Sequence, residues 1–264
     1  MFCTKEKVLR ILLVNDDGIN APGIRSLQKA LTSAGHKVIM VAPDSERSAA
    51  SHSISLRKDI QATRIAEDEW AISGTPVDCV VIALQKIITE KIDLVVSGIN
   101  AGQNMGEDVL YSGTVAAAME AAMFGYPAIA LSINAYRDQL FASATDWFMK
   151  LIRTGLDTLA KPREVLNINF PNILFEEVKG VRLTRTGHRK YYNFITIINE
   201  EEDSFSYRIG GDVPQWDFEA GTDSEAISEG YISITPLGFE LTRAETFPQI
   251  LSWIEQHKLL ELDR

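Results

Sequence analysis

Two adjacent carboxylates, Asp16 and Asp17, are the residues of this sequence best suited to chemistry. They follow the apolar stretch Val8–Val14, so we expect a buried strand to deliver them to its carboxyl end. Carboxylates so close repel each other unless a cation or a proton lies between them. Oxygen ligands favour Mg²⁺ or Mn²⁺, with Ca²⁺ also possible, over a metal that prefers thiolates. The alternative is that one Asp only caps a turn or a helix, because Asp-Gly is common in turns.

Two further oxygen donors follow two other predicted strands. Ser48 lies in the polar loop after Lys37–Ala42, and Asn100 lies just beyond Ile92–Ser97. Ligands of open parallel sheets bind beyond the carboxyl ends of the strands, where these residues would meet the Asp pair. The sequence therefore favours one divalent cation per subunit, held by Asp16, Asp17, Ser48 and Asn100.

A phosphate site is expected where Ser112, Gly113 and Thr114 open the small-residue helix Gly113–Phe124. The free N–H groups and the dipole of a helix N-terminus attract anions such as phosphate, although an ordinary Ser or Thr N-cap has the same sequence. Asn104, in the preceding Gly- and Asn-rich loop, would help to steady the phosphoryl oxygens.

We therefore assign catalytic roles to Asp16, Asp17 and Asn104. The nucleophile could be a water activated by a metal or one of the two Asp carboxylates, and the sequence leaves both routes open. His52, in the Ser-rich loop, could meet a ligand, whereas Glu120 is expected to be a structural carboxylate with a partner. A serine-hydrolase triad is not expected, because the sequence contains no G-x-S-x-G motif.

The elements that position these residues repeat one pattern in the first half of the chain: apolar strand, polar turn, amphipathic helix. Near-continuous apolar strands joined by helices predict a parallel sheet that is covered on both faces. Further strands are expected at Glu69–Ser73, Pro127–Ser132, Val165–Phe170 and Tyr231–Thr235, and further helices from Pro76, over Asp138–Leu159 and over Phe247–His257. The fold class is therefore α/β, with a doubly wound, mostly parallel sheet in a single domain over residues 1–264.

The charge pattern changes after the middle of the chain. Lys179–Lys190 contains five Lys or Arg and no acidic residue, whereas Asn199–Glu225 contains nine Asp or Glu against one basic residue. Such complementary blocks suit a C-terminal β-hairpin excursion, an arm over about residues 180–225 that packs on the body or on a second subunit. Two solvated loops are the alternative. An arm that packs on a second subunit predicts a closed homo-oligomer, chiefly a homodimer.

Composition excludes several other classes of function. The formal net charge of −10 argues against binding of a nucleic-acid polymer or an anionic membrane surface. The two cysteines, Cys3 and Cys79, cannot form a disulfide framework or a zinc cluster. No apolar run approaches the roughly 20 residues that span a bilayer, and the apolar run near the N-terminus is too short for a signal peptide. The expected location is the cytoplasm.

The same residues together resemble the SurE (survival protein E) family of metal-dependent 5′-nucleotidases. The matching stretches are ILLVNDDGINAPGI, VAPDSERSAASHSISL, GTPVDCV, DLVVSGINAGQNMGEDVLYSGTVAAAMEA and GTDSEAISEGYISITPL, which span nearly the whole chain. The resemblance implies the same metal ligands and phosphate contacts and a SurE-type fold. It also implies hydrolysis of nucleoside 5′-monophosphates, with broader phosphatase or short-polyphosphatase activity in some members. The region Arg185–Asp217 matches the family least.

Two alternatives are kept beside this interpretation. Haloacid-dehalogenase-like phosphatases have an Asp-x-Asp motif after their first strand. Here Gly18 occupies the place of the second Asp. A non-catalytic nucleotide-binding stress protein could use the same fold, because fold does not determine function. An enzyme would release phosphate from a nucleoside monophosphate and would stop doing so when a chelator is added. A binding protein would release none.

Overall fold

The fold is seen in a computed structural model of the chain, which describes residues 7–190, 195–201, 203–209, 215–257 and 259. The described strands are β1 Arg10–Val14, β2 Lys37–Pro43, β3 Ala62–Ala66, β4 Glu69–Ile72, β5 Leu94–Ala101, β6 Ala128–Ile133, β7 Val165–Phe170, β8 Val181–Leu183, β9 His188–Lys190, β10 Ile195–Glu201, β11 Ser204–Ile209, β12 Gln215–Asp217 and β13 Ile232–Leu237. The α-helices are α1 Pro22–Ser33, α2 Pro76–Ile82, α3 Gly113–Met123, α4 Phe141–Arg153, α5 Asp223–Ser228 and α6 Phe247–Gln256.

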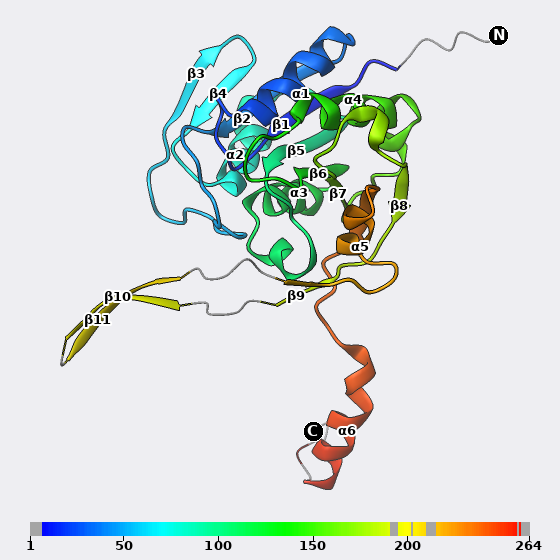
Figure 1. Cartoon of the computed structure of the whole chain (residues 1–264). Coiled ribbons are helices and arrows are strands. Elements are labelled where there is room, and N and C mark those ends of the chain that lie inside the picture. The colour runs from blue at the N-terminus through cyan, green and yellow to red at the C-terminus, as the bar shows by residue number, and fades with distance from the viewer. Residues whose placement is uncertain (1–6, 191–194, 202, 210–214, 258, 260–264) are drawn as a thin grey trace, which may run out of the picture.

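Nine strands form the central sheet, in the order β3-β4-β2-β1-β5-β6-β7-β13-β8 (Figure 1). The strands pair in parallel, except that β3 runs antiparallel to β4 and β13 runs antiparallel to β7. In the middle of the sheet, Leu13 on β1 is in register with Met40 on β2 and with Val96 on β5. The prediction of a mostly parallel α/β sheet is confirmed.

Helices cover both faces of the sheet because its central strands are apolar on both sides. On one face, Ile11 and Leu13 of β1 belong to a core with α1 and α4. On the other face, Leu12 and Val14 belong to a core with α2 and α3. This doubly wound arrangement brings the carboxyl ends of β1, β2 and β5 to one edge, where the predicted site residues lie.

Two elements differ from the expectation. The helix expected over Asp138–Leu159 ends at Arg153, because Gly155 adopts a left-handed conformation with φ of 90°, and a short 3₁₀ turn follows. β3 was not expected, because all five of its residues are exposed and it lacks the apolar signature of a buried strand.

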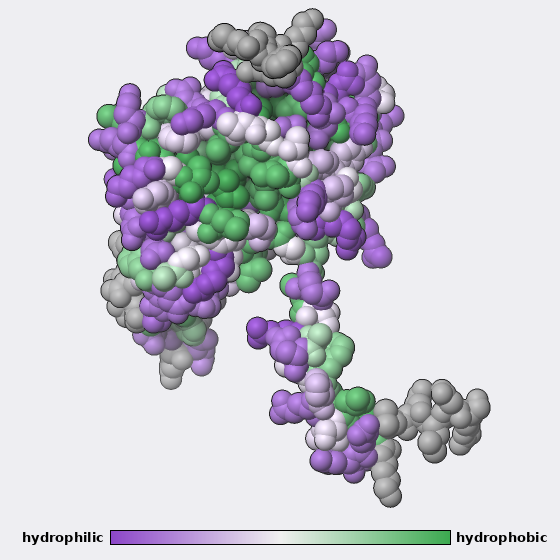
Figure 2. All heavy atoms as spheres, turned by 90° about the vertical axis from the view of Figure 1, so that its right-hand side faces the viewer, coloured by the Kyte–Doolittle hydropathy of each residue, from purple (hydrophilic) through white to green (hydrophobic). Residues whose placement is uncertain are grey.

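The predicted excursion over residues 180–225 consists of parts that belong to the body and parts that leave it. β8 pairs with β13 in the central sheet, and α5 also packs on β13. β9 and β12 pair antiparallel, and β10 and β11 form a hairpin that projects from the body (Figure 1). α6 also stands away from the body (Figures 1 and 2). In the described part of the chain, no helix is long and apolar enough to cross a membrane.

Candidate metal and phosphate site

Asp16 lies at the end of β1, against the first turn of α3. Its carboxylate Oδ1 accepts a hydrogen bond from the hydroxyl of Thr114, and its side chain is almost entirely buried. A Cβ at Gly113 would lie 2.8 Å from the Cβ of Asp16 and 2.9 Å from its Oδ2. The absence of a side chain at Gly113 therefore lets the helix N-terminus touch the Asp16 carboxylate, a contact that the sequence did not predict.

Asp17 is less buried and faces the end of β5. Its Oδ2 accepts a hydrogen bond from the backbone N–H of Ala101 at 3.1 Å. Burial, and then the charge of Asp16, raise the pKa of Asp17 to about 7, and burial also raises the pKa of Asp16. Neither carboxylate forms an ion pair with a basic residue in the described part of the chain. Two adjacent carboxylates without a basic partner fit a divalent cation.

Asn100 is oriented by its own loop. Its Nδ2 donates a hydrogen bond to the carbonyl of Gly102 at 2.8 Å, which leaves the side-chain oxygen Oδ1 as an available ligand. The next residue, Ala101, supplies the N–H that binds Asp17. The structure thus brings Asn100 next to the Asp pair, on the neighbouring strand of the sheet.

Ser48 is brought to the same edge by the loop after β2. The backbone N–H of the preceding Arg47 donates to the carbonyl of Asp16 at 2.8 Å. The hydroxyl of Ser48 itself donates to the carboxylate of Glu46. The negative charge of Glu46 also contributes to the raised pKa of both Asp16 and Asp17, so Glu46 is a third nearby carboxylate, which was not among the predicted site residues.

The donor set determines which metals fit. Among the described residues, no group of three or more His, Cys, Asp or Glu side chains could hold a metal ion. A cation bound here would therefore need the neutral oxygens of Ser48 and Asn100 beside the two Asp carboxylates. Such an all-oxygen set suits Mg²⁺, Mn²⁺ or Ca²⁺ rather than zinc.

Asn104 is held by buried polar residues of β6 and β7. Its N–H donates to Asn169 Oδ1 at 2.9 Å, and its carbonyl accepts from the Nδ2 groups of Asn167 and Asn169 at 2.8 and 3.0 Å. Its side-chain Nδ2 donates to the Ser132 hydroxyl at 2.8 Å. These three supports were missed, although polar residues inside the apolar run Val165–Phe170 were a visible signal.

The start of α3 combines an N-cap with contacts to Asp16. Ser112 is the N-cap, and its Oγ accepts from the N–H of Val115 at 3.0 Å. The hydroxyl of Thr114 donates its hydrogen to the Asp16 carboxylate. In the first turn, the N–H of Val115 is used by the cap and the backbone N–H of Thr114 binds Asp16, which lowers the pKa of that carboxyl against the larger effect of burial. The donors left for an anion are the hydrogen of the Ser112 hydroxyl and the N–H of Gly113.

His52 and Glu120 form a pair beside this site. The Nε2 of His52 lies 2.8 Å from Glu120 Oε2, which is partly buried on α3, so the expected partner of Glu120 is present. The neighbouring Ser51 donates to the carbonyl of Leu110 at 2.7 Å. The Ser-rich loop is thereby fixed to the segment that leads into α3.

Comparisons with known proteins identify the family of this chain. A family model described as survival protein SurE matches residues 11–193. A protein of Thermosynechococcus vestitus named 5′-nucleotidase SurE is 40% identical over 256 residues, which cover 93% of this chain and 97% of the relative. A protein of the same name from Aeromonas hydrophila is 39% identical over 253 residues, with 94% and 99% covered.

A solved structure shows the same fold. The crystal structure of the SurE protein from Aquifex aeolicus superposes with a TM-score of 0.82 at 36% sequence identity, and the match covers 93% of this chain and 99% of that one. The similarity therefore extends over most of the chain. Since both the family model and relatives of full length match, this chain belongs to the SurE family.

Proposed function

We propose that this chain hydrolyses nucleoside 5′-monophosphates to nucleoside and phosphate with the help of one divalent cation per subunit. The observation that carries the proposal is the contact of the buried Asp16 carboxylate with the first turn of α3. A cation site and an anion site so close together suit a phosphate ester. The relatives named 5′-nucleotidase SurE support the same activity.

Four side chains would hold the cation: Asp16, Asp17, Ser48 and Asn100. When bound, the cation would supply positive charge that polarises the phosphoryl group. The hydrogen bond from Asn100 Nδ2 to the carbonyl of Gly102 orients the available oxygen of Asn100. The hydrogen bond from the N–H of Arg47 to the carbonyl of Asp16 holds the loop that carries Ser48. Mg²⁺ and Mn²⁺ are the cations that we favour, with Ca²⁺ as a third candidate.

The remaining residues would orient the phosphate. The N–H of Gly113 opens α3, and the hydroxyl of Ser112 has a hydrogen to donate. Thr114, the third residue predicted for the phosphate, binds Asp16 through its hydroxyl and its N–H and would act on the phosphate through that carboxylate. Asn104 has a second Nδ2 hydrogen besides the one that it donates to Ser132. These donors would neutralise and align the phosphoryl oxygens, while the nucleophile remains either a water or an Asp carboxylate.

We also propose that the chain acts as a homodimer or homotetramer. α6 has no buried residue, and Phe247, Ile250, Leu251 and Trp253 are each about half exposed. In Figure 2, hydrophobic residues also gather on the face of the body that is turned to the viewer, above the point where the α6 segment leaves the body. The β10–β11 hairpin is exposed along its whole length, and an isolated two-stranded hairpin is only marginally stable. Packing against a second subunit would cover both elements.

One assay tests the proposed activity. Phosphate release should be measured with a panel of nucleoside monophosphates and a short polyphosphate, with Mg²⁺, Mn²⁺ or Ca²⁺ and with a chelator. We expect the parent to release phosphate from the monophosphates. A chelator should abolish this release, and Asp16→Asn should show none. Binding without release would instead support the nucleotide-binding alternative. The family match favours the proposed activity over the haloacid-dehalogenase alternative. The cytoplasmic location stays a prediction.

A further inference from the structure

The loop that carries Asn104 is fixed at a second point by a residue far along the chain. Asp223 is fully buried at the start of α5. Its Oδ2 accepts the N–H of Gly106 at 2.9 Å, two residues beyond Asn104. Its Oδ1 accepts the N–H of Gly187 at 2.8 Å and that of Ser224 at 2.8 Å. One carboxylate therefore joins the loop after β5, the segment before β9 and the first turn of α5.

Two glycines make this approach possible. A Cβ at Gly106 would lie 2.8 Å from the carbonyl oxygen of Gly187 and 3.1 Å from the ring of Trp216. A Cβ at Gly187 would lie 2.8 Å from the Ser224 hydroxyl and 3.0 Å from Asp223 Oδ1. The two backbones can reach the same carboxylate only because neither residue has a side chain.

The strand that follows Gly187 contacts the same loop. Glu107 Oε1 lies 2.7 Å from the ring nitrogen of His188, and Glu107 Oε2 accepts the N–H of Arg189 at 2.8 Å. The guanidinium of Arg189 forms an ion pair with Asp108, and both side chains are largely buried. The loop Gly106–Leu110 and β9 are therefore held together over several consecutive residues.

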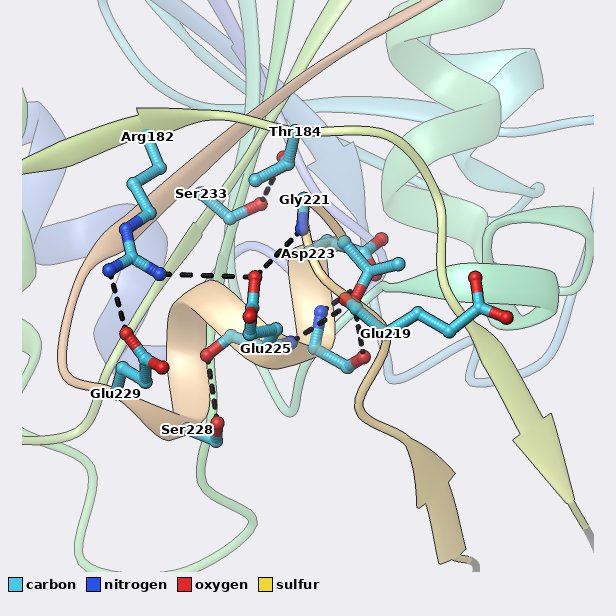
Figure 3. A network of polar contacts seen from close by, with 11 residues as sticks. Arg182, Thr184, Glu219, Gly221, Asp223, Glu225, Ser228, Glu229 and Ser233 are labelled. Carbon is cyan, nitrogen blue, oxygen red and sulfur yellow. Dashed lines mark hydrogen bonds and ion pairs between the residues drawn. The ribbon is translucent and has the colours of Figure 1, made fainter.

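α5 is itself fixed on its other side, so Asp223 has a firm support. Glu225 accepts the N–H of Gly221 at 2.8 Å and lies 3.9 Å from Arg182 of β8, and Arg182 also pairs with Glu229. Figure 3 shows Asp223 beside this network at the beginning of the helix. None of these hydrogen bonds and ion pairs joins Glu225 to residues 103–110, so a variant of Glu225 is a suitable control for a variant of Asp223.

We propose that Asp223 is a positioning residue for the reaction, acting by holding the loop that places Asn104. β6 and β7 fix Asn104 from one side through Ser132, Asn167 and Asn169. Asp223 fixes the loop from the other side through Gly106, and it ties the same loop to the segment that leads into the arm. The inference rests on the proposed function for the role of Asn104, but the loop contact itself does not.

The first test is Asp223→Asn, which keeps the size of the side chain but leaves one acceptor oxygen. Its NH₂ group must then face either the N–H of Gly106 or that of Gly187. We expect kcat for nucleoside monophosphate hydrolysis to fall by roughly 10- to 100-fold, because small displacements of a positioning group have effects of this size. Glu225→Gln, on the same helix, should leave kcat within about twofold of the parent, because the Glu225 side chain does not contact the loop that carries Asn104.

A double-mutant cycle separates positioning from a general loss of stability. If Asp223 acts through Asn104, then Asp223→Asn should cause little further loss of kcat in the Asn104→Ala background. An equal loss of kcat in both backgrounds would overturn the proposal, because it would show an effect independent of Asn104. Unchanged kcat in Asp223→Asn alone would overturn it as well.

Hydrogen exchange of the full chain, without substrate, gives a readout independent of activity. Amides of residues 103–110 should exchange faster in Asp223→Asn than in the parent or in Glu225→Gln, while the amides of β1 and β5 should not change. If Asp223→Asn does not fold, Gly187→Ala, which crowds Asp223 Oδ1, replaces it with the same expectation. Unchanged exchange in this loop would refute the proposal. A parent that hydrolyses no nucleotide would refute the proposed function instead, and the exchange data would still decide whether Asp223 holds the loop.

Discussion

The hydroxyl of Thr114 donates a hydrogen bond to the carboxylate of Asp16, although 98 residues separate the two in the chain. This contact joins the end of β1 to the first turn of α3 inside the protein, where both side chains are buried. The helix N-terminus carries partial positive charge that favours the carboxylate, yet burial raises the pKa of Asp16 overall. The site thus contains a carboxylate whose charge is only partly compensated by the protein, and a cation would complete the compensation.

Thr114→Val tests the importance of this bond, because valine keeps the shape of threonine and removes the hydroxyl. The buried Asp16 carboxylate would lose a hydrogen-bond donor, which typically costs about 1–3 kcal/mol. We expect the free energy of unfolding, measured with urea in the presence of Mg²⁺, to fall by about that amount. The stabilisation that Mg²⁺ gives should also become smaller, since Asp16 would be less well oriented.

Thr145→Val is the matched control for this substitution. Thr145 is also buried, and its hydroxyl lies 2.8 Å from the neutral hydroxyl of Ser26, far from the site in the packing of α1 against α4. We expect a smaller loss, about 0.5–1.5 kcal/mol, and full retention of the Mg²⁺ effect. Equal Mg²⁺ stabilisation in Thr114→Val and Thr145→Val would show that the Thr114 bond does not support the metal site.

The raised pKa of Asp17, about 7, predicts how the stability of the metal-free protein depends on pH. In the unfolded chain this carboxyl loses its proton near the ordinary pKa of 3.8, whereas in the folded chain it keeps the proton up to about pH 7. The folded state therefore binds more protons between these values. The contribution of Asp17 to the free energy of unfolding therefore falls as the pH rises from about 4 to about 7, and it is constant above that range.

Urea unfolding between pH 4.5 and 8 in the presence of a chelator should show this decline. Asp17→Asn cannot ionise, so its stability should decline less steeply over the same range and exceed that of the parent at pH 8. Groups elsewhere titrate equally in both proteins and cancel in the comparison. Parallel pH profiles for parent and variant would show that Asp17 does not carry the effect.

The sequence was sufficient for the parts of the fold that follow from local patterns. The strand Arg10–Val14 is apolar on both faces, and the turn residues Asp16 and Asp17 follow at once, so the strand and its polar end are both visible in the sequence. The same holds for Asn100 after β5. Because parallel strands place their carboxyl ends at one edge, local patterns also predicted that these residues meet.

The supports of the site were not predictable in the same way, since they depend on contacts between distant segments. Asp223 binds Gly106 across 117 residues, and nothing in the local sequence around either residue indicates the other. Asn167 and Asn169 lie within a strand that was recognised correctly, but the pairing of β6 with β7 was needed to show that they hold Asn104. Such supports become visible only when the tertiary structure is known.

The β10–β11 hairpin predicts how the proposed assembly can be disrupted. Ile195 is paired with Ile209, and Ile197 with Tyr207, so one face of this exposed hairpin is apolar. We expect light scattering to give the parent a mass at least twice 29.3 kDa at micromolar concentration. Ile197→Lys should lower this mass, because a charge would enter the surface that a second subunit covers.

Thr196→Lys is the control for the hairpin, since neighbouring residues of a strand point to opposite faces. Thr196 is in register with Arg208 rather than with an apolar residue, and the substitution adds the same charge. The mass of this variant should equal that of the parent. A monomeric parent at all accessible concentrations would contradict the proposed assembly, and equal masses for both variants and the parent would show that the hairpin is not part of the interface.

Gly113→Ala tests the contact between the two halves of the site. The added Cβ would lie 2.8 Å from the Cβ of Asp16, 2.9 Å from its Oδ2 and 3.1 Å from Pro76, so either Asp16 or the start of α3 must move. Both the proposed cation ligand and the proposed phosphate donors would be displaced together. We expect kcat to fall by about 100-fold, and the rise in melting temperature caused by Mn²⁺ to shrink, because the metal would bind the native state more weakly.

Ser112→Ala, one residue earlier, provides the comparison. It removes a cap and one hydroxyl donor but leaves Asp16 and the backbone N–H groups in place, so hydrolysis should weaken only by the roughly 1–3 kcal/mol of a hydrogen bond to a charged group. The rise in melting temperature with Mn²⁺ should be that of the parent. If Gly113→Ala retained both its activity and its response to Mn²⁺, the close approach of α3 to Asp16 would have no role in catalysis, and the phosphate would have to bind elsewhere, first in the Ser-rich loop around Arg47, Ser51 and His52.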